Sequence, residues 1–221
     1  MQDKSNEKKK NPLKKTLVLY TMNEIQGIKS IFDKIPIHLF DQFFVMDNHS
    51  DDGTVKFLEE RGVRVIQQKK PGRTNALIEA VGYATGDIIV SLSSDGNEKP
   101  EDIPKILEKF DEGYEMVTAS RFLPDSKVDV GDDKLRIRVF GNKLCAFLVN
   151  VCWDTNVTDT TNALRGFTKS CYKRTKLNTF GYTENFQLTI RCAKLKIKIT
   201  EVPTEELPRI GGIVKSDTKG V

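Results

Sequence analysis

Short apolar runs alternate with helix-like segments through the first half of the chain, and this alternation constrains the fold more than any other feature. Runs of β-prone residues lie at 16–20, 43–46, 63–66, 88–90 and 116–121. The segments between them place apolar residues at helical spacing. Strands and helices that alternate at this pace are typical of right-handed βαβ units around a largely parallel sheet. The sequence therefore predicts an α/β fold, with a mostly parallel central sheet flanked by helices.

Polar residues follow three of these runs, at 20–24, 47–54 and 93–96. Because the carboxyl ends of parallel strands meet at one edge of a sheet, we expect these clusters to converge there with Gly72 and Arg73. Asp95 is central to this prediction, since the preceding apolar run delivers its carboxylate to the end of a strand. An Asp that only caps a turn is the structural alternative. The convergence favours a nucleotide pocket, although the glycine-rich loops of P-loop and dinucleotide-binding proteins are absent.

The alternation stops after Arg121, and the spacing predicts a long helix over 135–153. We expect this helix to pack on the core through its apolar side, and the alternative is that it lies on a membrane surface. A run at 163–168, a helix at 184–193 and an edge strand at 196–202 follow. The apolar side of the long helix carries Ile137, Phe140, Leu144, Phe147, Leu148 and Val151, and the other side carries Arg136, Arg138, Asn142, Lys143 and Asn150.

The length of 221 residues suits one domain, preceded by a basic flexible tail over 1–15. The tail lacks the apolar core of a signal peptide, and contact with anionic lipid or polyphosphate is the alternative to a purely solvated leader. Apolar runs of the roughly 18–20 residues that cross a bilayer are absent from the sequence. Nucleic acid is not an expected partner, because acidic and basic residues are interleaved after the tail.

The four cysteines, Cys145, Cys152, Cys171 and Cys192, are far apart and lack C-x-x-C spacing. This pattern indicates neither a zinc site nor a disulfide framework. We expect buried, reduced thiols and a cytoplasmic protein. Peripheral contact with the cytoplasmic face of a membrane is compatible with that location.

Several motifs occur in order along almost the whole chain: Met22-Asn23-Glu24, Asp47-x-x-Ser50-x-Asp52-Gly53-Thr54, Gly72-Arg73-x-x-Ala76, Ala84-x-Gly86-Asp87 and Ser93-Ser94-Asp95-Gly96. Their order and spacing resemble family 2 glycosyltransferases, which have the Rossmann-like GT-A fold. The later motifs are similar to the dolichyl- and polyprenyl-phosphate sugar transferase branch. These are Ser120-Arg121-Phe122, Asp159-Thr160-x-x-Ala163-Leu164-Arg165-Gly166-Phe167, Glu201-Val202-Pro203 and Arg209-x-Gly211-Gly212-x-x-Lys215-Ser216.

The resemblance implies a nucleotide-sugar donor and a divalent metal, Mg²⁺ or Mn²⁺, bound by Asp95. A hard cation on carboxylate oxygen stabilises the negative charge of a departing nucleoside diphosphate. The base is expected near Tyr20, Glu24 and Asp47. The implied donor half is 16–121, and the acceptor half with the C-terminal loop is 122–221. The implied donor-binding residues are Tyr20, Asn23, Glu24, Asp47, Ser50, Gly72, Arg73, Ser93, Ser94, Arg165, Arg209 and Lys215, and the implied catalytic residues are Asp95, Glu184 and Arg121.

Two residues depart from the family pattern. Ser93 stands where the family usually has the first carboxylate of Asp-x-Asp, and Asn185 replaces the usual base of a Thr-Glu-Asp segment in Tyr182-Thr183-Glu184-Asn185. Glu184 is the nearest substitute base for a hydroxyl acceptor. A phosphate acceptor needs no base, because its oxygen is already anionic near neutral pH. The implied function is inverting transfer of a sugar to a polyprenyl phosphate or a membrane-linked glycan, and the alternative is a nucleotide-sugar binding or regulatory protein with reduced catalysis.

Overall fold

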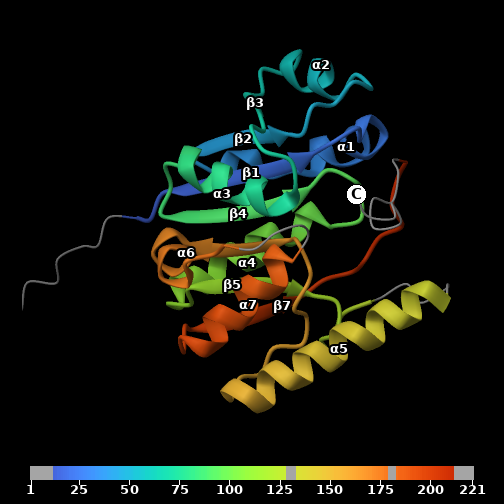
Figure 1. Ribbon diagram of the computed structural model, residues 1–221. Coiled ribbons are helices and arrows are strands. Elements are labelled where there is room, and N and C mark those ends of the chain that lie inside the picture. Colours follow the sequence, from blue (N-terminus) through green and yellow to red (C-terminus); the bar gives the residue numbers. More distant parts are fainter. Residues whose placement is uncertain (1–11, 128–132, 179–182, 212–221) are drawn as a thin grey trace, which may run out of the picture.

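A seven-stranded sheet in the order β3-β2-β1-β4-β6-β5-β7 forms the centre of the computed structural model, which describes residues 12–127, 133–178 and 183–211 (Figure 1). The neighbouring pairs β1–β2, β2–β3, β1–β4 and β5–β7 are parallel, whereas β6 is antiparallel to β4 and β5. The predicted α/β fold with a mostly parallel sheet is confirmed, and the reversal at β6 is an addition to it. The strands are β1 (Lys15–Thr21), β2 (Gln42–Asp47), β3 (Val65–Gln67), β4 (Ile88–Ser93), β5 (Met116–Ser120), β6 (Arg165–Thr168) and β7 (Ile199–Pro203).

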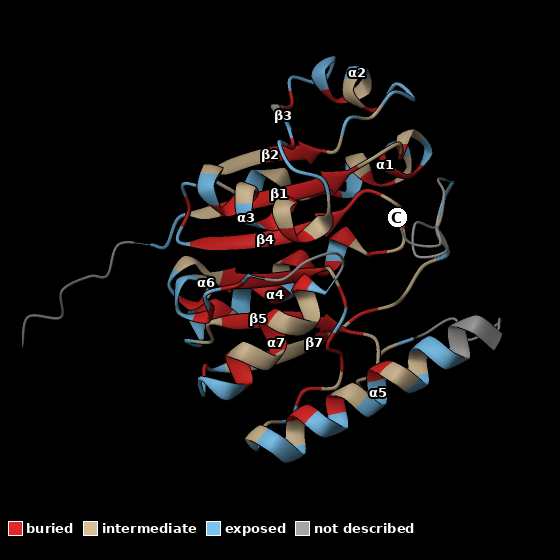
Figure 2. Ribbon diagram, in the orientation of Figure 1, coloured by how far each residue is buried: buried red, intermediate tan, exposed pale blue. Residues whose placement is uncertain are grey.

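Helices cover both faces of this sheet, because successive side chains of a strand point to opposite sides. Leu17 and Leu19 of β1 pack in one apolar cluster with residues of α1, α2 and α4, while Val18 and Tyr20 pack in another with residues of α3, α6 and α7. Figure 2 shows the strands between these layers as largely buried. The helices are α1 (Ile25–Ile31), α2 (Thr54–Glu59), α3 (Arg73–Tyr83), α4 (Ile103–Asp111), α5 (Asp133–Trp153), α6 (Lys169–Thr175) and α7 (Glu184–Lys194), with short 3-10 turns at Phe32–Lys34, Ile37–Leu39 and Pro100–Asp102.

Helix α5 packs against the body through a narrow stripe of Asn142, Ala146 and Val149, all of which are buried. The large apolar side chains predicted to face the core, Phe140 and Phe147 among them, are exposed instead. The expectation of core packing through the apolar side is therefore wrong for this helix. None of the helices in the described segments is both long and apolar enough to span a membrane.

The amino-terminal tail and the cysteines differ in part from expectation. Strand β1 already begins at Lys15, the last residue assigned to the tail, and residues 1–11 lie outside the described ranges. All four cysteines are free, as predicted, and Cys171 and Cys192 are buried. Cys152 is exposed and Cys145 is half-buried, so the expectation of four buried thiols is wrong for these two. Both lie on α5, which is less covered by the body than the sequence suggested.

Candidate active site

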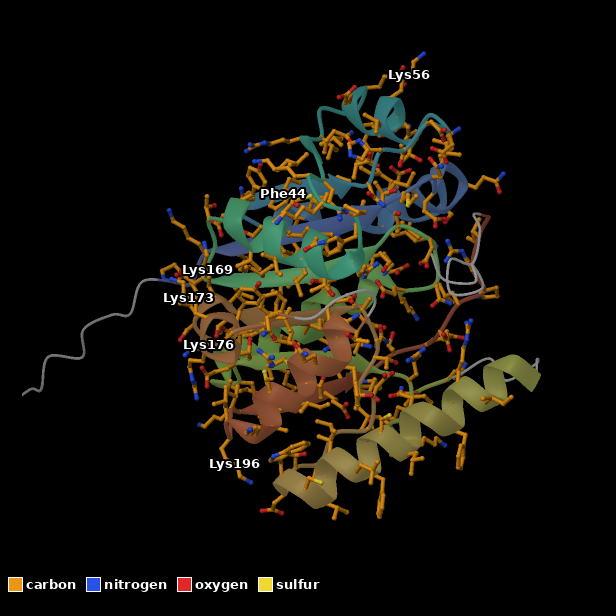
Figure 3. The ribbon with its side chains drawn as sticks, in the orientation of Figure 1. Phe44, Lys56, Lys169, Lys173, Lys176 and Lys196 are labelled. Atoms are coloured by element: carbon orange, nitrogen blue, oxygen red, sulfur yellow. The ribbon has the colours of Figure 1, made fainter. Side chains whose placement is uncertain are left out.

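A cavity of about 580 Å³ opens where β1 and β4 end, at the sheet edge predicted to carry the site. The register places Tyr20 beside both Met46 and Ser93, so the ends of three parallel strands reach the same level. Lys169, Lys173 and Lys176, labelled in Figure 3, lie around α6 near the amino end of β4, away from this opening. The predicted site residues that line the cavity are Tyr20, Glu24, Gly72, Arg73, Ser93, Ser94, Asp95, Arg121, Glu184 and Arg209.

The predicted donor residues Asn23, Asp47 and Ser50 build the loop beside the cavity and do not line it. The buried Asp47 carboxylate accepts hydrogen bonds from the Ser50 backbone N–H at 2.9 Å and from its hydroxyl at 2.5 Å. Ser50 Oγ in turn accepts from the Asn23 N–H at 2.8 Å. The neighbouring Asn48 lines the cavity instead. The structure therefore assigns these three predicted residues to loop geometry, and direct contact of Asp47 with a base is not supported by its placement.

Arg73, the first residue of α3, connects three walls of the cavity. Its Nη2 donates to Ser93 Oγ at 3.1 Å, its Nε lies 3.3 Å from Glu184 Oε1, and its guanidinium lies 5.0 Å from the centre of the Tyr20 ring. Burial raises the pKa of Glu184, and the positive charge of Arg73 only partly opposes this shift. Burial also raises the pKa of the Tyr20 hydroxyl. Arg73 is thus held in place by a partly satisfied carboxylate, a hydroxyl and an aromatic face.

Asp95 follows β4 and is bridged to Glu24 by Arg209. Arg209 Nη1 lies 3.1 Å from Asp95 Oδ2, and Nη2 contacts Glu24 Oε1. Asp95 Oδ1 accepts from the Asn97 N–H at 3.2 Å, and the Asp95 carbonyl accepts from the Ile210 N–H at 3.0 Å. The C-terminal segment that carries Arg209 is therefore fastened across the turn after β4, and it brings a positive charge from the far end of the chain to Asp95.

Arg121 follows β5 and is paired with two carboxylates. Its Nε lies 2.7 Å from Asp159 Oδ2, and its Nη1 lies 3.0 Å from Glu206 Oε1. Although burial opposes the shift, the hydrogen bonds and charge of Arg121 hold the pKa of Asp159 below its usual range. Arg121 therefore forms part of the cavity wall, while most of its N–H donors bind carboxylates of the protein rather than facing the cavity.

Arg165 lies outside the cavity lining and is almost fully buried. Its guanidinium donates to the backbone carbonyls of Asn162 at 2.8 Å and Asn185 at 3.0 Å. Burial lowers its pKa to about 10. Arg165 is a predicted donor-binding residue, and the structure places its side chain between β6 and the start of α7 rather than in the cavity lining. Lys215 and Tyr182 lie outside the described residues.

Several lining residues were not predicted: Asn48, Asn97, Arg138 and Glu206. Glu98 lies just behind the wall, where its Oε2 accepts from the Ser93 N–H at 2.7 Å. Burial first and the charge of Asp95 second raise the pKa of Glu98 to about 7. The one sequence feature that could have indicated Glu98 as part of the site is its position three residues after Asp95. Arg138 and Glu206 come from α5 and the C-terminal segment, and nothing local in the sequence indicates that they reach this cavity.

The residues present fit a hard divalent cation that shares its coordination with a ligand. Within the described ranges, no cluster of three His, Cys, Asp or Glu residues could hold a metal alone. Asp95 offers carboxylate oxygen at the cavity wall, and Mg²⁺ commonly uses one or two carboxylates together with phosphate and water. Ser94 Oγ, Glu184 Oε2 and Glu206 Oε2 are buried at this site without a hydrogen-bond partner among the described residues. Such atoms suit a ligand that brings hydroxyl donors or positive charge.

Comparison with known proteins places the chain in a family. The sequence model of glycosyl transferase family 2 matches residues 17–175, so the chain belongs to this family. Glycosyltransferase AglJ of Haloferax volcanii is 28% identical over 200 residues, which cover 90% of this chain and 63% of AglJ. The dolichyl-phosphate hexose transferase of the same organism is 29% identical over 202 residues, covering 88% of this chain and 83% of that protein.

A solved structure supports the fold. Glucosyl-3-phosphoglycerate synthase from Mycobacterium tuberculosis, crystallised with Mn²⁺ and UDP-glucose, superposes with a TM-score of 0.73 at 22% identity. The match covers 92% of this chain and 73% of the synthase. The GT-A fold expected from the motifs is therefore confirmed, and so is the resemblance to family 2 glycosyltransferases.

Proposed function

We propose that this protein is an inverting glycosyltransferase that moves a sugar from a nucleotide-diphosphate sugar to a polyprenyl phosphate. The observation that carries the proposal is the convergence of Asp95, Arg73 and Arg209 on one cavity at the carboxyl edge of the sheet. Such a site combines a metal-binding carboxylate with cations that suit a diphosphate. The names of the dolichyl-phosphate relative and of the synthase crystallised with UDP-glucose support the acceptor and donor classes.

The donor would lie between the ends of β1 and β4. Tyr20 and Asn48 offer a ring and an amide near the base, and Gly72 lies at the start of α3 beside Arg73. Asp95 would hold Mg²⁺ or Mn²⁺, which supplies Lewis-acid stabilisation of the leaving diphosphate when bound. Arg73 and Arg209 would neutralise the charge that remains on the diphosphate oxygens.

The acceptor would enter from the side of Arg121, the last residue of the proposed donor half, and Arg138, which belongs to the proposed acceptor half, 122–221. A phosphate oxygen attacks the anomeric carbon, the bond from that carbon to the diphosphate breaks, and its electron pair leaves with the nucleoside diphosphate. This step requires no proton transfer to a base. The structure offers Glu184 as an ion-pair partner of Arg73, so its proposed role is to position that guanidinium.

The direct test is release of nucleoside diphosphate from UDP-, GDP- and CDP-sugars with a short-chain polyprenyl phosphate, with and without Mg²⁺ or Mn²⁺. We expect one base to be accepted, and Asp95→Asn should abolish release while the thermal unfolding curve stays close to that of the wild type. Failure of every nucleotide sugar to bind would contradict the proposal. Unchanged turnover in Asp95→Asn would show that Asp95 does not hold the metal.

Ser93 favours a second candidate, a nucleotide-sugar binding protein with reduced catalysis, because this residue supplies a hydroxyl where the family usually has a carboxylate. Binding of a nucleotide sugar without release of nucleoside diphosphate to any lipid-phosphate or glycan acceptor would support this candidate. Family membership and the intact set of Asp95, Arg73 and Arg209 favour the enzyme.

A further inference from the structure

The outer side of α5 is an exposed apolar stripe. Phe140 is 69% exposed, Phe147 is 61% exposed and Ile137 is 72% exposed. Elsewhere in the described residues, exposed large apolar side chains occur singly rather than along one element. A contiguous apolar surface on a water-exposed helix indicates an interaction site, whereas scattered apolar residues do not. Figure 2 shows exposed segments alternating with buried ones along α5. The stripe consists of Ile137, Phe140, Leu144, Phe147, Leu148 and Val151.

Buried hydrogen bonds on the inner side of α5 fix this orientation. Asn142 Nδ2 donates to Asp159 Oδ1 at 2.8 Å, and Asn142 Oδ1 accepts from the Thr160 hydroxyl at 2.6 Å. One turn from the end of the helix, Asn150 Nδ2 donates to the Val157 carbonyl at 2.8 Å. Rolling the helix to bury its stripe would leave these groups unpaired, and each buried unpaired polar group costs about 1–3 kcal/mol. The apolar stripe therefore stays outward.

The charge of α5 complements an anionic surface. The helix contains four basic residues, Lys134, Arg136, Arg138 and Lys143, and one acidic residue, Asp133, at its first position. Arg138 and Lys143 are exposed beside the stripe. A basic residue near an anionic membrane surface contributes about 1 kcal/mol of attraction. Two copies of α5 paired face to face would instead bring like charges together.

We propose that the apolar stripe of α5 docks the protein onto a bilayer that contains anionic lipid, with the helix lying in the plane of the interface. Arg138 is exposed on α5 and also lines the cavity, so docking places the cavity opening next to the lipid headgroups. The inference rests on the proposed function in one respect, because a polyprenyl phosphate acceptor would lie in the same bilayer. The docking surface itself depends only on the stripe and its basic flank.

Vesicle flotation tests the docking surface with the intact protein. The vesicles consist of phosphatidylcholine with or without phosphatidylglycerol and contain neither polyprenyl phosphate nor a nucleotide sugar. We expect the wild type to float with the anionic vesicles. The double variant Phe140→Ser/Phe147→Ser should lower the partition coefficient by about tenfold or more, because two phenyl rings no longer leave water. Ile78→Ser/Leu195→Ser, which alters apolar residues exposed elsewhere, is the matched control and should bind like the wild type.

A variant that removes one positive charge measures the electrostatic contribution to vesicle binding separately from the apolar contribution. Lys143→Gln should weaken binding to anionic vesicles several-fold, whereas Lys173→Gln on α6 should not. Wild-type protein that stays unbound to anionic vesicles would overturn the proposal, as would equal binding by the Phe140→Ser/Phe147→Ser variant. A wild-type dimer that this variant converts to a monomer in light scattering would also overturn it, because a second copy would then cover the stripe.

The two proposals fail separately. Flotation without nucleoside diphosphate release leaves docking intact and contradicts the transferase. Release in detergent without flotation leaves the transferase intact and contradicts docking. Nucleotide-sugar binding by the phenylalanine variant, which should match the wild type, verifies that its fold is retained.

Discussion

Removal of Arg209 should change metal binding and nucleotide binding in opposite directions. A divalent cation held by Asp95, as proposed, would have to replace the Arg209 guanidinium, which lies 3.1 Å from Asp95 Oδ2. The side chains of Arg209 and Asp95 are 27% and 22% exposed, and a partly exposed ion pair contributes about 1 kcal/mol at most. Arg209→Ala should therefore raise the affinity for Mn²⁺ alone by about fivefold.

The same substitution should weaken nucleotide-sugar binding. If Arg209 turns from Asp95 to the diphosphate, its loss removes charge-assisted hydrogen bonds that contribute about 1.5–3 kcal/mol. This corresponds to roughly ten- to hundredfold weaker binding. The opposite signs are the distinguishing feature, because general damage to the site would weaken both ligands.

Calorimetric titration of Mn²⁺ without nucleotide, and of the nucleotide sugar with saturating Mn²⁺, measures both affinities. Arg174→Ala is the matched control, because Arg174 is exposed and forms an ion pair with Glu115 that involves no cavity residue. Arg209→Lys should change both affinities in the same directions as Arg209→Ala but by less, because lysine retains the positive charge and lacks the fork of donors. A Mn²⁺ affinity that is unchanged or lower in Arg209→Ala would refute the reasoning.

Two further predictions concern stability. Because the folded-state pKa of Glu98 is raised from 4.5 to about 7, its contribution to stability is complete below about pH 4.5 and is lost as pH rises through about 7. Glu98→Gln should remove up to about 3 kcal/mol of this pH dependence, and urea unfolding that depends on pH as in the wild type would contradict it. A Cβ at Gly27 would lie 2.3 Å from the Ser94 carbonyl oxygen, so Gly27→Ala should lower stability by about 1–3 kcal/mol and weaken Mn²⁺ binding. Gly82→Ala in α3, where a Cβ meets nothing within 4 Å, should instead stabilise by about 0.5–1 kcal/mol, and a thermal melt that ranks the two variants the other way would contradict this.

The strands and the position of Asp95 were predictable because they depend on local periodicity. The direction of each side chain at a strand end was not. Asp47 ends β2 and turns into the loop to bind Ser50, while the adjacent Asn48 lines the cavity. The sequence marks both as polar and contains no local signal that separates them. That choice depends on the path of a loop fixed by the distant Asn23.

Helix α5 shows the same limit on a larger scale. Its periodicity correctly separates an apolar side from a polar side, and hydrophobicity alone would bury the apolar one. The buried side is instead decided by Asn142, whose partners Asp159 and Thr160 come after the helix. Asp159 also holds Arg121 at the cavity wall. One nonlocal carboxylate therefore sets both the orientation of the helix and the position of a predicted site residue.

Ser93 changes the charge balance of the cavity, because it supplies a hydroxyl where the family usually has a carboxylate. An aspartate at this position would form an ion pair with Arg73, whereas the Ser93 hydroxyl accepts the same hydrogen bond at 3.1 Å without charge. Arg73 is then paired with the buried Glu184, whose Oε1 lies 3.3 Å from Arg73 Nε. A diphosphate would therefore meet an Arg73 guanidinium that is less neutralised than an Asp-x-Asp motif would leave it. In the proposed site, this departure would transfer part of the neutralisation of the diphosphate from the metal to Arg73, while Asp95 would be the carboxylate that holds the metal.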